Sequence, residues 1–155
     1  MLKLTKKADY GLIAMRYLAE NGTSSASAKD IAEAHGIPPE LLAKILQKLV
    51  KNGLLVSQHG MNGGYVLARE PRNISALEVI KAIDGPLFIT SCGDEKHGCY
   101  QSRKCTVREP LRKVNESIQQ VLSRLSIADM KEQPQDAEDT GLKADHFDLV
   151  TLSSH

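Results

Sequence analysis

The fold is decided by residues 28–67, which read AKDIAEAHGIPPELLAKILQKLVKNGLLVSQHGMNGGYVL. A first helix is expected over about 28–35, and Gly36 suits the left-handed position that ends it. Pro38-Pro39 then opens a second helix, because proline is tolerated in a first turn whose N–H groups are unpaired. The apolar side chains of that helix recur at helical spacing, at Leu41, Leu42, Ile45, Leu46 and Leu49. Asn52-Gly53 ends it.

The spacing of apolar residues changes after this point. Residues 54–58 and 65–67 are β-like runs, and the intervening HGMNGG supplies three glycines and an asparagine for a tight hairpin. Two helices with a short glycine-containing turn, followed by a hairpin, are typical of a winged helix-turn-helix. Further helices are expected from the cap Thr5 to about Asn21, and from the capping box of Ser75 and Glu78 to about Ile83.

The longest expected helix follows the cysteines. Its apolar residues lie three or four positions apart, at Val107, Leu111, Val114, Ile118, Val121, Leu122 and Leu125. Such a helix must bury its stripe, and pairing with its twin in a second subunit is the simplest way to do so. The alternative is that the stripe folds back on its own domain. The predicted fold class is mainly α with a small β-hairpin wing: a winged helix-turn-helix domain plus a long dimerisation helix.

The length of the chain and the distribution of its charges limit the classes of protein to which it can belong. The chain has 155 residues and a mass of 17.0 kDa, enough for one compact domain with an appended arm and tail. The net charge of +1 divides into +4 for residues 1–69 (nine Lys/Arg, five Asp/Glu), +2 for 70–125 (nine, seven) and −5 for 126–155 (two, seven). The amino-terminal half is therefore basic, and in a dimer it carries about +8, which suits several phosphate contacts. With no Trp and two Phe, the core is expected to be aliphatic.

Four segments are expected along the chain. Residues 1–70 form the winged helix-turn-helix DNA-binding domain, 71–105 the connecting helix and a cysteine loop, 106–130 the dimerisation helix, and 131–155 an acidic, flexible tail. The amino terminus lacks the apolar core of a signal peptide, and no apolar run approaches the roughly 18 residues that span a bilayer. The three cysteines are an odd, clustered set that makes a poor disulfide framework. We therefore expect a cytoplasmic protein with reduced thiols and no membrane contact.

The helix-turn-helix pattern predicts which residues face DNA. The second helix of such a unit enters the major groove with its amino-terminal residues toward the base edges. Candidates for base contact are Pro39, Glu40, Ala43 and Lys44, and candidates for phosphate contact are Lys48 and Lys51. The wing tip is expected to reach a minor groove or the backbone through His59, Asn62 and Gly63. The alternative is a protein-interaction module whose lysines form a solvated face.

The cysteines Cys92, Cys99 and Cys105 are separated by six and then five residues. These spacings are too wide for the paired C-x2-C knuckles of most zinc sites, but they allow one loop to wrap an iron–sulfur cluster. Three thiolates leave one coordination position, for which His97, Asp9 and solvent are candidates. Three alternatives stay open: buried thiols acting as small hydrophobes, a Cys3His zinc site that uses His97, and a redox switch that forms a disulfide.

Five blocks of sequence together resemble one known family. They are LTKKADYGLIAMRYLA at 4–19, DIAEAHGIPPELLAKILQKLVKNGLL at 30–55, GMNGGYVLAREP at 60–71, ALEVIKAIDG at 76–85 and the three-cysteine loop. In this order, over residues 2 to about 130, they are similar to the IscR, NsrR and RirA family of dimeric winged-helix regulators. The resemblance implies a homodimeric bacterial transcription factor, most simply a repressor, that binds double-stranded promoter DNA. It also implies that the three cysteines hold an iron–sulfur cluster whose presence or loss changes DNA affinity, and that the genes controlled serve cluster assembly, iron homeostasis or nitrosative and redox stress.

Two positions depart from parts of this family. In the IscR branch a histidine ligand follows the third cysteine by three residues, and here that position is Arg108, which does not ligate metal. In the NsrR branch a carboxylate near the amino terminus, contributed by the other subunit, completes a four-iron cluster, and Asp9 matches it. The resemblance therefore favours a 4Fe-4S over a 2Fe-2S cluster with Asp9 as a ligand, although a first-turn acid also favours a helix dipole or pairs with a lysine. His59 stands where the family usually has arginine, so the operator of a relative does not transfer to this chain.

The sequence lacks the motifs of the common enzyme classes. The chain has no Ser-His-Asp arrangement, no phosphate-binding glycine loop between strand and helix, and no zinc-protease helix motif. An enzyme with a small-molecule substrate is therefore not expected. The alternatives that remain are a zinc-containing or thiol-redox winged-helix regulator and, further off, a small iron–sulfur redox protein.

Overall fold

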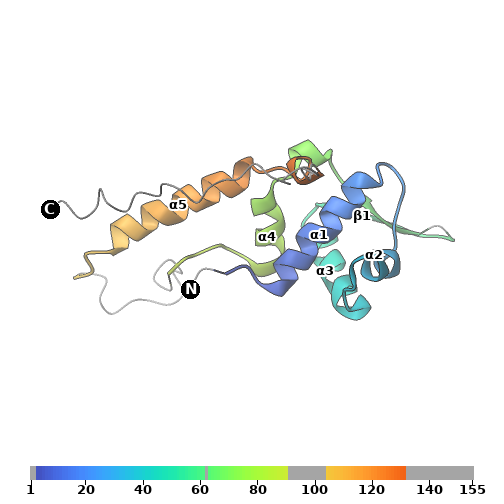
Figure 1. The fold of residues 1–155 in the computed structure, drawn as a ribbon, viewed down its shortest axis with the longest axis horizontal. Coiled ribbons are helices and arrows are strands. Elements are labelled where there is room, and N and C mark those ends of the chain that lie inside the picture. The colour runs from blue at the N-terminus through green and yellow to red at the C-terminus, as the bar shows by residue number, and fades with distance from the viewer. Residues whose placement is uncertain (1–2, 62, 91–103, 132–155) are drawn as a thin grey trace, which may run out of the picture.

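The structure is a computed structural model that describes residues 3–61, 63–90 and 104–131. Its elements follow one another as α1 (Lys6–Glu20), α2 (Ala28–His35), α3 (Pro39–Lys51), β1 (Leu55–Gln58), β2 (Gly64–Leu67), η1 (Pro71–Asn73), α4 (Ala76–Asp84), α5 (Arg108–Arg124) and η3 (Asp129–Lys131). Figure 1 shows α1 to α4 gathered into one helical body, with the hairpin projecting on one side and α5 extending on the other. This arrangement confirms the predicted fold class.

The residues that the sequence predicts as helix caps form capping contacts at the ends of α1, α2 and α4 in the structure. The Thr5 hydroxyl accepts a hydrogen bond from a first-turn N–H of α1, and Gly36 ends α2 with φ of 64°, in the left-handed region. At the start of α4, Ser75 and Glu78 form both hydrogen bonds of a capping box. A second capping box, between Ser27 and the third residue of α2, begins that helix.

The core is aliphatic, as expected from the composition. It is built by the inner faces of the first four helices and by the base of the hairpin. Its largest fully buried side chains are Met15, Leu18, Ile31, Leu42, Ile45, Leu46, Leu49, Ile74, Val79, Ile80 and Ile127. No charged or polar side chain is buried in the described part of the chain.

The wing is a two-stranded antiparallel hairpin whose register runs from Leu55 opposite Leu67 to Gln58 opposite Gly64. It is anchored to the loop before α2, because Ala26 and Tyr65 exchange backbone hydrogen bonds of 3.2 and 2.8 Å. A Cβ at Gly64 would lie 2.5 Å from the Ala26 carbonyl oxygen, so this close approach requires glycine. The base of the wing is thereby fixed to the helical body.

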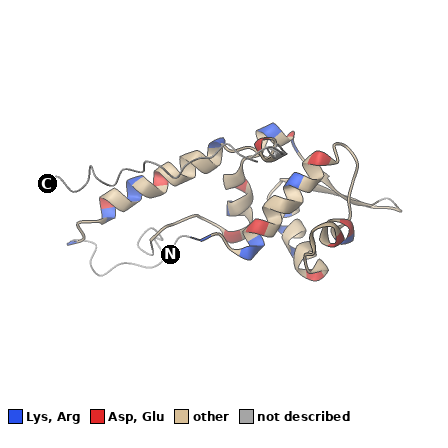
Figure 2. Ribbon diagram, viewed as in Figure 1, with Lys and Arg blue, Asp and Glu red and all other residues tan. Residues whose placement is uncertain are grey.

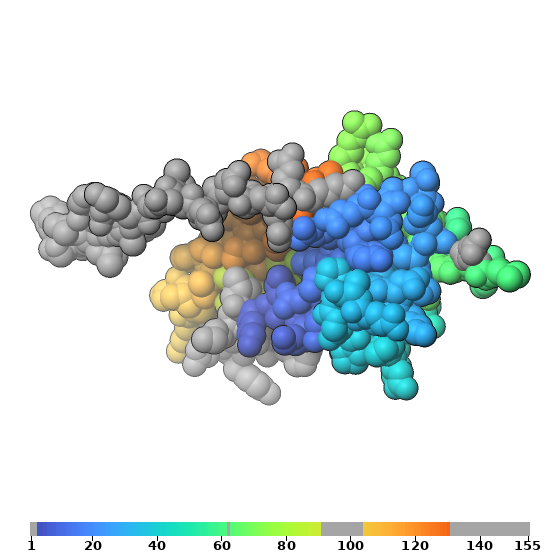
Figure 3. Space-filling model, turned by 45° about the vertical axis from the view of Figure 1, so that its right-hand side comes forward, coloured from blue at the N-terminus to red at the C-terminus, as the bar shows by residue number. Residues whose placement is uncertain are grey.

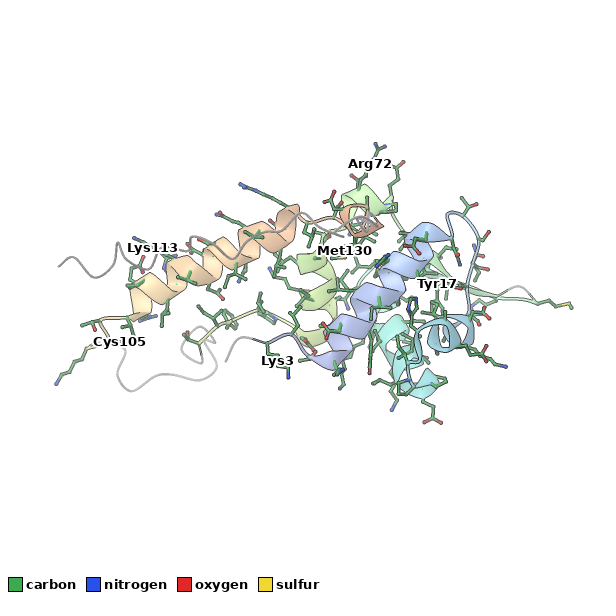
Figure 4. All side chains as sticks on the ribbon, in the orientation of Figure 1. Lys3, Tyr17, Arg72, Cys105, Lys113 and Met130 are labelled. Atoms are coloured by element: carbon green, nitrogen blue, oxygen red, sulfur yellow. The ribbon has the colours of Figure 1, made fainter. Side chains whose placement is uncertain are left out.

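After α5 the chain returns to the body. The Ala76 N–H donates to the Leu125 carbonyl at 2.8 Å, and the Ile127 N–H donates to the Ile74 carbonyl at 2.9 Å. Ile127 is fully buried and Met130 packs against the core; Figure 4 shows Met130 next to the helical body. Of the expected dimerisation segment 106–130, only 108–124 is α-helical, and the residues after it attach α5 to the domain.

Candidate functional site

α3 has two distinct faces. Its apolar residues from Leu42 to Leu49 are buried against α1, α2 and α4, whereas Glu40 and Lys44 are exposed. Pro39 is also exposed, and Ala43 is half-buried beside them. The four residues that the sequence predicts for base contact therefore lie in the first half of α3, and three of them are exposed. This is the half that a helix-turn-helix presents to the major groove.

The two lysines that the sequence predicts for phosphate contact differ in their surroundings. Lys51 is exposed and has no hydrogen bond or ion pair to another described residue. Lys48, one turn after Lys44, instead donates from its Nζ to the Ile83 carbonyl oxygen in the last turn of α4, at 3.2 Å. No local sequence signal indicates this contact, since the two residues are 35 positions apart.

The wing tip is fully accessible. His59 and Gly60 are exposed, and Gly60 has φ of 119°, which favours glycine. A Cβ at Gly63 would lie 2.8 Å from the Gln58 carbonyl oxygen, so the tip also requires glycine there. Asn62 lies outside the described residues. Figure 3 shows this hairpin standing clear of the body.

Met61 at the wing tip is a residue that the sequence reasoning missed. Its side chain has a relative exposure of 105%, the highest among the exposed large hydrophobic residues. A large apolar residue inside a glycine-rich hairpin is the signal that could have found it. Apolar side chains at such tips contact minor-groove sugars or wedge between base steps.

Of the predicted cluster ligands, the structure describes Cys105 and Asp9. Cys105 is a partly buried free thiol shortly before α5, and Figure 4 shows it beyond the end of α5 that is farther from the helical body. Asp9 is exposed in the first turn of α1, and its carboxylate has no hydrogen bond or ion pair to a described residue. Cys92 and Cys99 lie outside the described residues. Among the residues that the structure does describe, no group of three His, Cys, Asp or Glu side chains could hold a metal ion.

α5 carries an uncovered apolar strip. None of its residues is buried, and Val114 and Val121 are 47% and 67% exposed. An open groove of about 430 Å³ runs along this strip, lined by Lys113, Val114, Ser117, Ile118, Val121 and Leu122. Figure 2 shows that the acidic and basic residues of α5 gather in its amino-terminal half, followed by an uncharged stretch that ends at the basic Arg124. In the described part of the chain, one side of α5 contacts α4, and the side that carries Val114 and Val121 is left uncovered.

In the ranges that the structure describes, no helix is both long enough and apolar enough to cross a membrane.

α2 and α3, the short turn between them, the accessible start of α3 and the adjoining hairpin define a winged helix-turn-helix protein of the DNA-binding class. Comparison with known proteins gives the family. Residues 4–133 match the Rrf2 family, described as an iron-dependent transcriptional regulator, and the chain belongs to this family.

Individual relatives agree with this assignment. The HTH-type transcriptional regulator IscR of Klebsiella pneumoniae (strain 342) is 32% identical over 130 residues, which cover 83% of this chain and 79% of that protein. The structure of T. potens IscR is 34% identical with a TM-score of 0.70, covering 89% of this chain and 94% of that one. The structure of CymR, the global cysteine regulator of B. subtilis, is 28% identical with a TM-score of 0.69, covering 84% and 97%. The chain is thus an IscR-like, DNA-binding transcriptional regulator rather than an enzyme, as the sequence predicted.

Proposed function

We propose that this chain is a homodimeric repressor that binds promoter DNA and senses an iron–sulfur cluster. The observation that carries the proposal is the place of the cysteine segment in the chain. It connects α4, which packs against the DNA-binding helices, to α5, whose apolar face is uncovered. A group bound by these cysteines acts at the junction between the DNA-binding body and the dimer interface.

DNA contact is assigned to α3 and the wing. Pro39, Glu40, Ala43 and Lys44 face base edges, and His59, Asn62 and Gly63 reach the minor groove or backbone, joined by Met61. Lys51 faces phosphate. Two copies bind half-sites about 34 Å apart, so a small change in dimer geometry prevents both recognition helices from docking at once.

The dimer interface is assigned to α5. Burial of a half-exposed valine contributes about 1 kcal/mol, and the strip offers several apolar side chains at helical spacing. The paired charges at the start of α5, such as Arg112 with Glu109, are exposed and contribute little to stability. The apolar half of the helix therefore dominates association.

The cluster site is assigned to Cys92, Cys99, Cys105 and Asp9 of the partner subunit. The chemistry of this donor set fits, because thiolates are the usual ligands of iron–sulfur clusters and a fourth corner accepts another ligand type. The unpaired carboxylate of Asp9 and the position of Cys105 outside the helical body support a site shared between two subunits. When bound, a 4Fe-4S cluster supplies a centre that iron shortage, oxidants or nitric oxide disrupt, which suits control of cluster assembly, iron homeostasis or stress genes.

A titration of promoter DNA tests this proposal. Anaerobically purified protein is measured with its cluster and after chelation, at several salt concentrations. We expect affinity to fall steeply with salt, because phosphate contacts release counterions, and to change when the cluster is removed. Lys44→Met is the control, since it should weaken binding equally in both forms. Equal affinity of the two wild-type forms would contradict cluster sensing.

A thiol-redox or zinc-dependent regulator is the second candidate. The similarity to CymR favours it, because one solved CymR structure, from Staphylococcus aureus, is of an oxidized form, and this chain is 26% identical to it with a TM-score of 0.65. Metal analysis of the purified protein separates the candidates: iron with sulfide supports the first, and zinc or no metal supports the second.

A further inference from the structure

The last turn of α4 is capped by side chains from the end of α3 and from Asn52, the residue directly after that helix. A helix leaves its final four carbonyl groups without partners inside the helix. Here the Ile83 carbonyl oxygen accepts from Lys48 Nζ at 3.2 Å, and the Ala82 carbonyl oxygen accepts from Asn52 Nδ2 at 3.5 Å. A cation at a helix carboxyl terminus also interacts favourably with the helix dipole. The recognition helix is therefore bonded directly to the end of α4.

The same turn is held from the other side by α1. The Thr5 hydroxyl donates to Asp84 Oδ2 at 2.6 Å. Ile83 is 4% exposed and packs so closely on α1 that a Cβ at Gly11 would lie 2.0 Å from its Cδ1. That same Cβ would lie 3.5 Å from Ile45 of α3, so α1, α3 and α4 meet at this point. Because such a junction is closely packed, displacement of the last turn of α4 displaces its neighbours.

The segment directly after this turn is bonded to α5. The Ile89 N–H donates to Asn115 Oδ1 at 3.1 Å, and Gln119 Nε2 donates to the Leu87 carbonyl oxygen at 3.0 Å. Two hydrogen bonds from α5 to Leu87 and Ile89, the backbone between these residues and Ile83, and the Lys48 bond form one set of connections from α5 to α3. Both elements that flank the cysteine segment in sequence belong to this set.

We propose that Lys48 is a positioning residue, which couples the end of α4 to the recognition helix and does not serve DNA affinity through a phosphate contact. Its bond to the Ile83 carbonyl fixes the orientation of α3, and with it the side chains of Glu40 and Lys44. This inference rests on the proposed function, because it names the route by which the state of the cysteine site reaches the DNA-binding face. Allosteric coupling of this kind requires that the two states differ in a contact along the route.

The test compares four full-length proteins: wild type, Lys48→Met, Lys48→Arg and Lys51→Met. Methionine keeps most of the aliphatic stem but removes the donor, and arginine restores a donor. Lys51→Met removes an equal charge from the same helix without breaking a bond to α4. For each protein, promoter affinity is measured in the cluster-bound and cluster-free forms, and thermal melting of the cluster-free form checks that it is folded.

The ratio of the two affinities decides the outcome. If the wild-type ratio is roughly tenfold, within the usual range of allosteric coupling, Lys48→Met should bring it within about twofold while Lys48→Arg and Lys51→Met keep it. An unchanged ratio in a folded Lys48→Met protein, with affinity lowered equally in both forms, would overturn the proposal in favour of a phosphate contact. A wild-type ratio of one overturns cluster sensing itself, which distinguishes the two failures. If Lys48→Met does not fold, Asn52→Ala is measured in its place, and a ratio as large as that of the wild type overturns the route through α4.

Discussion

Replacing Gly11 by alanine should destabilise the protein, although alanine is the better helix former. The new Cβ would lie 2.0 Å from Ile83 Cδ1 and 3.5 Å from Ile45 Cγ2, and both isoleucines are at least 96% buried. Overpacking of this kind costs about 1–3 kcal/mol, and the gain in helix propensity from glycine to alanine offsets about 0.5–1 kcal/mol. We expect a net loss of about 1 kcal/mol and a Tm lower by about 2–4 °C.

A second substitution tests the assigned contact. Ile83→Val removes the Cδ1 atom that the new methyl group meets, and alone it should cost about 1 kcal/mol. In the double variant Gly11→Ala, Ile83→Val the methyl group occupies the vacated space, so its cost should be smaller than the sum of the two single costs. Ile74→Val is the control, because Ile74 is equally buried but is not a neighbour of Gly11, and its cost should add to that of Gly11→Ala.

The assay is urea unfolding followed by circular dichroism, at one fixed protein concentration because a dimer's stability depends on concentration. Two results would refute the close contact between α1 and α4 at Ile83. One is a Gly11→Ala protein as stable as the wild type, and the other is a loss of stability in the double variant equal to the sum of the losses in Gly11→Ala and Ile83→Val.

Three further predictions concern the ligand, the interface and pH. Asp9→Ala should leave a cluster that binds but decays faster in oxygen, measured by visible absorbance; unchanged decay would give the role to His97 or solvent. Val121→Asp should yield folded monomers in sedimentation equilibrium, because the side chain is 67% exposed in the single chain; a persistent dimer would exclude this face. Burial raises the pKa of Glu78, but hydrogen bonds from Ser75 and the Arg69 guanidinium outweigh it and the pKa falls below its ordinary 4.5. The ionised Glu78 carboxylate therefore stabilises the fold slightly; this contribution is fully present above pH 4.5 and is lost as the pH falls through the lowered pKa. The difference in Tm between the wild type and Glu78→Gln should therefore shrink in acid. A difference in Tm that stays constant from neutral pH into acid would refute this prediction.

Local signals account for the parts of the fold that the sequence predicts well. Thr5, Gly36 and the Ser75 with Glu78 pair each act within four residues, so a single sequence suffices to place the ends of α1, α2 and α4. The glycines of the wing act in the same way. The apolar spacing of α3 and the stripe from Val107 to Leu125 give the lengths of α3 and α5 to within one or two residues, whereas the expected helical segment 106–130 runs six residues beyond α5.

Contacts between distant segments account for what the sequence does not predict. Ile127 falls inside the expected dimerisation segment 106–130, yet it is buried in the core because the chain after α5 pairs with residues 74–76. Lys48 reads as one more basic residue on an exposed face, and only the packing of α4 against α3 brings the Ile83 carbonyl within its reach. The candidate DNA and cluster residues stay predictions, since their chemistry depends on DNA and on a second subunit.

The central claim is tested most directly by the visible absorption spectrum of the full-length protein purified without oxygen. We expect a brown protein with a broad sulfur-to-iron charge-transfer band, and the loss of this band in Cys99→Ala while the chain stays folded. A colourless wild-type protein that contains zinc, or a Cys99→Ala variant that keeps the full chromophore, would contradict it.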